Sequence, residues 1–214
     1  NNYTLDSDVL CAADFGAPQK RMRFVIMGIK KDIASKVKLP IGSFTGKKYR
    51  SVRDAIEDLE DVAPVFDLTE DEAGTPLEEK DGLCDLAQAL RNSAVLKNHI
   101  VTKTTDTAME RFRALKQGEN FHALDESLKT NTYTDASRTQ NTIYLRLNYD
   151  EPSGTVVNVR KSMWIHPTLD RAISVREAAR LQSFPDDYFF EGSWSAAFKQ
   201  IGNAVPVLLA EKIA

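Results

Sequence analysis

The chain has 214 residues, of which 42% are hydrophobic, and a formal net charge of −3. It has no apolar run near the roughly 18 residues of a membrane span, no signal-peptide pattern at its start, and no histidine at a metal-ligand spacing from a cysteine. Its two cysteines, Cys11 and Cys84, fit a reducing compartment. The sequence therefore predicts a cytoplasmic protein without a metal site or membrane partner.

The acidic residues are concentrated in one segment. Residues 54–85 contain thirteen acidic side chains and one basic one, Lys80, so this segment carries −12 and the remainder of the chain carries +9. A basic body beside an acidic segment is compatible with one face that binds phosphates. The acidic segment itself is typical of a solvated surface.

The N-terminal part predicts two strands joined by a turn. Residues 3–10 are a weak strand candidate, glycine and proline mark a turn at 14–18, and residues 19–30 predict a second strand. Residues 24–29 are apolar apart from one glycine, which is typical of a strand buried on both faces.

Three polar side chains alternate along the start of this second strand. Gln19, Arg21 and Arg23 point to one side of a strand with period two. A guanidinium offers a rigid fork of donors, which suits a phosphate or a base edge. The alternative is that both arginines only pair with surface carboxylates.

The middle of the chain predicts helices, a loop and a hairpin. Residues 51–59 and 107–116 have helical spacing of apolar residues, with Ser51 and Thr107 as N-caps. The acidic residues 62–82, with proline and glycine, predict a surface loop. Two further strand patterns lie at 142–147 and 155–159, separated by a Pro-Ser-Gly turn.

Two basic residues, Arg160 and Lys161, follow the predicted hairpin. They are candidates for phosphate or base contacts, although two basic residues in a loop are more often only solvated.

A short helix with a defined start and end is predicted near the C-terminus. Ser174 and Glu177 have the spacing of a capping box, and a Phe-Pro step ends the helix. Arg176 and Arg180 lie four residues apart on one face. From the pattern alone this is an ordinary capped helix with solvated arginines.

The last residues predict another helix. Gly202 and Asn203 favour a turn or helix start, and Pro206 suits a first helical turn.

The residue identities in three stretches are more specific than their helix and strand patterns. VREAARLQSFPD closely resembles the ninth conserved motif of the DNA cytosine-5 methyltransferases, DFGAPQKRMR resembles the eighth, and GNAVP resembles the tenth, in the family's order. The resemblance implies an α/β fold: the C-terminal part of an S-adenosylmethionine-dependent methyltransferase sheet with a small, loop-rich α+β target-recognition domain. Residues 1–34 would be the last strands of the catalytic domain, 35–192 the target-recognition domain including the VREAARLQ helix, and 193–214 a helix that returns to the catalytic domain.

The resemblance also implies roles for single residues. Arg21 and Arg23 would clamp a flipped cytosine, Arg23 by donating to O2 of the base and Arg21 near the target phosphate. A donor at O2 stabilises the negative charge that develops on the ring. The predicted DNA contacts are Gln19, Thr155, Arg160, Lys161 and Arg176. The methionine end of S-adenosylmethionine would lie against Asn203, Ala204 and Val205, where many family members carry serine in place of the alanine.

Three parts of the family's pattern are absent from the sequence: the Phe-x-Gly-x-Gly turn, the Pro-Cys nucleophile and the Glu-Asn pair. Neither Cys11 nor Cys84 follows a proline. The prediction is therefore the C-terminal half of a bacterial, nucleoid-associated methyltransferase, as a fragment or a split subunit. Its partners would be double-stranded DNA and the N-terminal half, and it would be inactive alone.

Two other classes stay open. A non-catalytic DNA-binding subunit or degenerate methyltransferase module would bind duplex DNA in a salt-sensitive way without methyl transfer. A protein-interaction domain that uses the acidic segment would bind its partner equally well after Arg21→Ala and Arg23→Ala.

Overall fold

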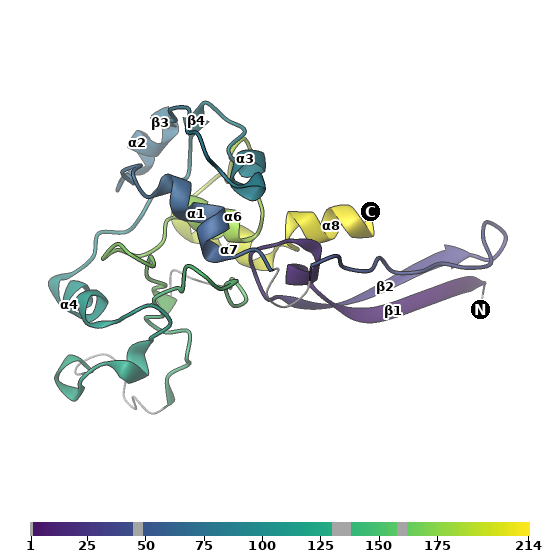
Figure 1. The fold of residues 1–214 in the computed structure, drawn as a ribbon, viewed down its shortest axis with the longest axis horizontal. Coiled ribbons are helices and arrows are strands. Elements are labelled where there is room, and N and C mark those ends of the chain that lie inside the picture. The colour runs from purple at the N-terminus through teal and green to yellow at the C-terminus, as the bar shows by residue number, and fades with distance from the viewer. Residues whose placement is uncertain (1, 45–48, 130–137, 158–161) are drawn as a thin grey trace.

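The computed structural model describes residues 2–44, 49–129, 138–157 and 162–214. A two-stranded ribbon projects from a body of short helices and loops (Figure 1). The strands are β1 (Tyr3–Cys11), β2 (Met22–Lys30), β3 (Thr75–Pro76) and β4 (Val95–Leu96). The α-helices are α1 (Val52–Ile56), α2 (Leu68–Ala73), α3 (Asp85–Leu90), α4 (Asp106–Ala114), α6 (Val175–Leu181), α7 (Trp194–Asn203) and α8 (Val207–Ile213). Short 3-10 helices are η1 (Ala12–Phe15), η3 (Glu57–Leu59), η4 (Phe121–Ala123) and η5 (Glu126–Leu128).

The ribbon confirms both predicted N-terminal strands, although the second begins at Met22 and not at residue 19. β1 and β2 pair antiparallel, with Val9 opposite Phe24. One face of the ribbon packs at its base on α8, where Val25 joins an apolar cluster with Leu209. The other face is bare: Phe24 is 64% and Ile26 61% exposed. The predicted burial of this strand on both faces is therefore wrong for this chain, because nothing in the described residues covers that face.

The main core lies in the body. Buried side chains of α1, α3, α6 and α7 form one apolar cluster that extends from Val52 to Ile201 and includes Trp164, which is 0% exposed. The cluster contains residues on both sides of position 192, where the sequence predicted the boundary between the recognition domain and the last helix. A second cluster, around Phe112 and Tyr144, holds α4.

Both capped helices predicted in the middle of the chain are present, but the start of one was misplaced. Ser51 caps α1 with the expected capping box. α4 begins two residues earlier than predicted, because the hydroxyl of Thr105, and not of Thr107, accepts from the backbone N–H of Ala108. The predicted loop at 62–82 is also wrong in part: it contains α2, capped by Asp67, and the strand β3.

The predicted hairpin at 142–159 is wrong in the residues that the structure describes. Residue Tyr144 has φ 52°, a left-handed conformation that breaks a strand. The backbone there forms isolated bridges to distant segments, Arg146 with Ile165 and Gln19 with Ser153. Gly202, predicted as a turn or helix start, instead lies in the last turn of α7.

No helix in the described ranges is long and apolar enough to cross a membrane.

Candidate functional site

Four segments that are far apart in the sequence meet in a buried polar junction. We define the junction as residues 18–21, 153–156, 181–183 and 201–208, which belong to the segment just before β2, a loop, the end of α6, and the end of α7 with the start of α8. All three stretches that resemble methyltransferase motifs contribute to it.

Gln19 connects three of these segments. Its side chain is 0% exposed. Its Nε2 donates to the Leu181 carbonyl and to Gln182 Oε1, each at 3.0 Å, and its Oε1 accepts from the N–H of Val156 at 2.9 Å. These bonds direct the Gln19 amide into the protein, where it joins three segments, so its position does not support the predicted DNA contact.

Arg21 is a buried cation that is bound by backbone carbonyls. It is 2% exposed, and its two Nη atoms donate to Val156 O and Gly202 O, each at 2.8 Å. Among the described residues no carboxylate forms an ion pair with it. Burial, and then the charge of Arg23, lower the pKa of Arg21 to about 10, so it stays protonated at neutral pH. The negative end of the α7 dipole offsets part of its charge.

Arg23 lies two residues further along the same side of β2 and is only partly buried. Its Nη1 donates to the carbonyl of its neighbour Met22 at 2.7 Å. Of the two predicted clamp residues, Arg23 therefore has the guanidinium that solvent or a ligand can reach.

The last residue of α7 and the loop that follows it carry the predicted cofactor residues. Asn203 and Val205 are exposed, and Ala204 is partly buried, with its N–H bonded to Gln200 O. Gly202, just before them, packs against backbone: a Cβ at this position would lie 2.7 Å from Val157 O.

The predicted DNA contacts outside the ribbon differ in position. Thr155 is partly buried at the junction, and its hydroxyl donates to Lys20 O at 3.2 Å. Arg160 and Lys161 lie outside the described residues.

Arg176 faces inward. It is 0% exposed and donates to the carbonyls of Lys97, Pro185 and Tyr188. Burial lowers its pKa to about 10. A DNA contact by Arg176 is not supported by this position, and the interpretation of solvated arginines on this helix is wrong as well.

The remaining charges of α6 are also buried and paired. Arg180 forms ion pairs with Asp58 and Asp186. Glu177 accepts from both Nη atoms of Arg171, at 2.8 and 2.6 Å, and from the N–H of the N-cap residue at 2.7 Å. Sequence reasoning identified the helix and its cap but missed these partners, which come from other elements.

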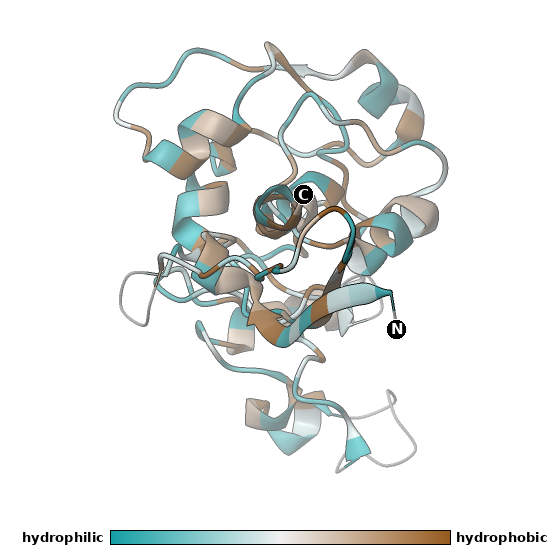
Figure 2. Cartoon of the chain, turned by 90° about the vertical axis from the view of Figure 1, so that its right-hand side faces the viewer, coloured by the Kyte–Doolittle hydropathy of each residue, from teal (hydrophilic) through white to brown (hydrophobic). Residues whose placement is uncertain are grey.

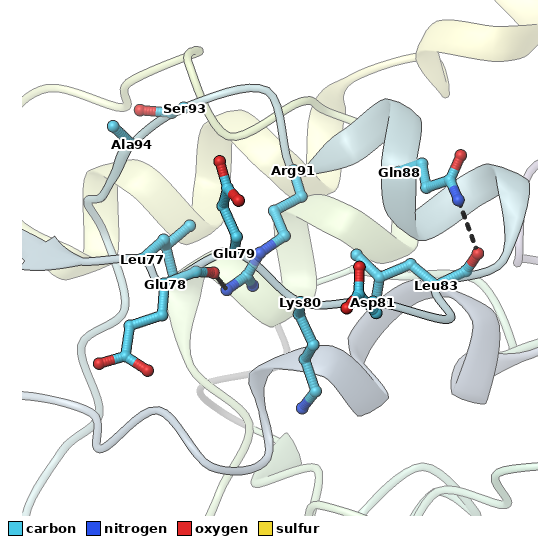
Figure 3. Close-up of a pocket in the computed structure, with 10 residues that line it drawn as sticks. All are labelled: Leu77, Glu78, Glu79, Lys80, Asp81, Leu83, Gln88, Arg91, Ser93 and Ala94. Atoms are coloured by element: carbon cyan, nitrogen blue, oxygen red, sulfur yellow. Dashed lines mark hydrogen bonds between the residues drawn. The ribbon is translucent and has the colours of Figure 1, made fainter.

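The cavities described in the body lie away from the junction. One of about 600 Å³ lies beside Arg91, whose Nη2 donates to Glu78 O at 2.7 Å (Figure 3). Two others, of about 450 and 490 Å³, are lined by residues of 58–98 and 189–192. None of these three contains a predicted site residue. The described residues contain no cluster of His, Cys, Asp and Glu that could hold a metal ion.

Comparison with known proteins identifies the class. Residues 1–214 match the family model of the C-5 cytosine-specific DNA methylases, so the chain belongs to this family. It is 32% identical over 229 residues to the type II methyltransferase M.DdeI of Desulfomicrobium norvegicum, a match that covers 96% of this chain and 52% of the relative. It is 34% identical over 212 residues to M1.HphI of Haemophilus parahaemolyticus, covering 99% and 47%.

The chain thus spans about half the length of these curated relatives. A shorter match, 39% identical over 130 residues, covers 56% of this chain and 85% of M.AquIB from Picosynechococcus. The crystal structure of a protein described as a DNA modification methyltransferase encoded within a prophage (E. coli) superimposes with a TM-score of 0.66 at 24% identity, covering 99% of this chain and 59% of that one. This likeness is consistent with a methyltransferase fold.

Proposed function

We propose that this chain is the C-terminal, DNA-recognising half of a DNA cytosine-5 methyltransferase that transfers methyl from S-adenosylmethionine to C5 of a flipped cytosine in duplex DNA. The observation that carries the proposal is the polar junction. It holds the segment with Arg21 and Arg23 beside the predicted cofactor residues. The nucleophile would come from the remaining part of the enzyme, because this sequence has no Pro-Cys pair.

Arg21, just before β2, and Arg23, the second residue of that strand, support a clamp for the base. Arg23 has the accessible guanidinium, and Arg21 adds a buried positive charge behind it without a carboxylate partner among the described residues. A buried cation strengthens the field at a site where negative charge develops during the reaction. Arg23 would donate to O2 of the flipped cytosine, and Arg21 would act on the base and its phosphate through this field.

The loop between α7 and α8 fits one wall of a cofactor site. The exposed Asn203 has an amide that makes no hydrogen bond within the described part of the chain, and the exposed aliphatic Val205 follows it two residues later. An amide next to an apolar side chain suits the polar and methylene groups of methionine. S-adenosylmethionine supplies an electrophilic methyl group, and Asn203, Ala204 and Val205 would hold its methionine end.

The bare ribbon face is consistent with a partner that completes the sheet. Leu5, Val9, Phe24 and Ile26 lie on this face and are all between 49 and 64% exposed. Hydrophobic residues lie along the ribbon in Figure 2. A two-stranded ribbon is at best marginally stable by itself, and exposed apolar patches mark interaction surfaces. We assign this face to the N-terminal half of the enzyme.

DNA contacts would come from Thr155, Arg160 and Lys161, with the basic remainder of the chain supplying attraction to phosphates. A non-catalytic DNA-binding subunit is the second candidate. It is favoured by the absence of the Pro-Cys pair from this sequence.

The test is transfer of labelled methyl from S-adenosylmethionine to unmethylated genomic DNA. This chain is assayed alone and mixed with the N-terminal half of the same enzyme. Methyl transfer only in the mixture is expected. In the mixture Arg23→Ala should slow the chemical step, whereas the exposed control Arg113→Ala should not. Duplex binding without transfer in any mixture would favour the DNA-binding subunit.

A further inference from the structure

We propose that Gln182 is a positioning residue that fixes the cofactor loop relative to the base-clamp strand. The cofactor loop here means residues 202–206, the last two residues of α7 and the three that follow, and the base-clamp strand means residues 19–23, at and just before the start of β2. This inference rests on the proposed function, since it takes that loop as one wall of the S-adenosylmethionine site. It assigns a role to Gln182, which is not among the predicted site residues.

Gln182 holds both ends of the cofactor loop. Its Nε2 donates to Ile201 O at 2.6 Å, just before the loop, and its own carbonyl accepts from the N–H of Val207 at 3.1 Å, just after the loop. The residue is 0% exposed. One residue at the end of α6 therefore fixes both the last turn of α7 and the first turn of α8, and the loop between them has little freedom to shift.

The same side chain continues to the base-clamp strand. Gln182 Oε1 accepts from Gln19 Nε2 at 3.0 Å, two residues before Arg21. Arg21 in turn donates to Gly202 O at 2.8 Å, inside the cofactor loop. The strand and the loop are thus joined by two routes, and Gln182 lies on the route that does not involve a charge.

The amide of Gln182 is required chemically because it donates and accepts at once. A glutamate at this position keeps the acceptor for Gln19 but cannot donate to Ile201 O, and it places a carboxylate against a carbonyl in a site without water access. A buried carbonyl that loses its donor is costly, and members of a buried network depend on one another. The loop would then shift to find another donor.

A second position tests the other end of the loop without touching this side chain. Val207 is the first residue of α8, and Pro206 before it already has extended ψ of 133°. Proline is favoured at a first helical position and the residue before it must be extended. Val207→Pro therefore replaces the N–H that binds Gln182 O with a ring carbon that must move away from this carbonyl, and it leaves the helix able to form.

The experiment uses the enzyme reassembled from this chain and its N-terminal half. We measure the Kd for labelled S-adenosylmethionine by equilibrium dialysis, the Kd for duplex DNA, and the melting temperature. Gln182→Glu and Val207→Pro should each raise the cofactor Kd about tenfold, the loss of one buried hydrogen bond, and leave the duplex Kd within twofold. The control is Gln200→Glu, an exposed glutamine on α7 that donates to Glu191 O and should change neither constant.

The inference is overturned if both variants bind the cofactor as the wild type does. It is also overturned if the cofactor Kd and the duplex Kd rise together in step with a lower melting temperature, because that pattern needs only general destabilisation. If Gln182→Glu does not fold, Val207→Pro alone decides. Failure of the wild type to bind S-adenosylmethionine would instead refute the proposed function, and this inference with it.

Discussion

Arg21 Nη2 lies 2.8 Å from the carbonyl oxygen of Gly202, 181 positions later in the chain. The bond places a buried guanidinium at the C-terminal end of α7, where carbonyls lack helical partners and the helix dipole is negative. Arg21 therefore joins the stretches that resemble the eighth and tenth methyltransferase motifs. A substitution in either stretch should alter the structure of the other.

Arg21→Ala should destabilise the chain far more than Arg23→Ala. Loss of Arg21 leaves Val156 O and Gly202 O without their donors, which we expect to lower the free energy of unfolding by about 3 kcal/mol. Arg23 bonds only its neighbour's carbonyl, so its loss should cost less than about 0.5 kcal/mol. Urea denaturation followed by fluorescence of the buried Trp164 measures both. Equal losses would contradict a structural role for the two bonds of Arg21.

Gly202→Ala should destabilise although alanine is the better helix former. Helix propensity alone would gain about 1 kcal/mol. The added Cβ, however, would lie 2.7 Å from Val157 O, and backbone cannot move aside as a flexible side chain can. We expect a net loss of about 1–2 kcal/mol. Gly154→Ala is the matched control, since a Cβ there meets nothing within 4 Å and should be neutral or slightly stabilising. The same sign for both variants would argue against a close approach at Gly202.

Local signals predicted local structure. The caps at Ser51 and Ser174 were predicted correctly because a capping box involves residues only three apart. The hairpin at 142–159 was not, because alternation of apolar residues does not reveal that the backbone of Arg146 pairs with Ile165. The exposure of Phe24 could not be read from an apolar run either, since burial depends on which elements cover the strand.

The candidate site was likewise predicted only in part. The resemblance to three motifs named Gln19 and Arg21, and the structure brings them together with the cofactor loop. The inward direction of Arg176 was missed, because its partners, such as Lys97 O, are up to 79 positions away. The role of Gln182 was missed for a related reason. Its main partners are Gln19 and Ile201, and the sequence around a glutamine at the end of a helix does not indicate such distant partners.

Phe24→Glu should prevent assembly with the N-terminal half. The side chain is 64% exposed on the bare face of the ribbon, and a carboxylate buried there would have no partner. We expect at least a tenfold weaker association, measured by titration calorimetry. The control is Leu68→Glu, another exposed apolar residue, at 41%, but on α2 in the body. Equal weakening by both variants, or by neither, would move the partner surface away from the ribbon.

Glu177→Gln should destabilise the chain by removing the buried ion pair between α6 and Arg171. Arg171 would lose its carboxylate partner in a buried site, which typically costs about 3–5 kcal/mol. Burial alone would raise the pKa of Glu177, but Arg171 and its hydrogen bonds hold it well below the usual range. Because the folded pKa is depressed, this stability is present above the unfolded pKa near 4.3 and is lost as pH falls below it. The difference between wild type and variant in urea denaturation should therefore shrink between pH 6 and pH 3.

His166→Gln should make the free energy of unfolding depend less on pH. The effect should lie at higher pH than that of Glu177→Gln. His166 is 0% exposed, and burial lowers its pKa from 6.5 to about 4. Between these values the unfolded chain binds the proton and the folded chain does not, so the free energy of unfolding falls as pH falls, by about 3 kcal/mol from this group by pH 4. Glutamine does not titrate, so the variant should show a shallower slope from pH 6.5 to 4. A slope remains because burial also lowers the pKa of His99. Identical slopes for wild type and variant would show that His166 is protonated at its usual pH in the folded chain.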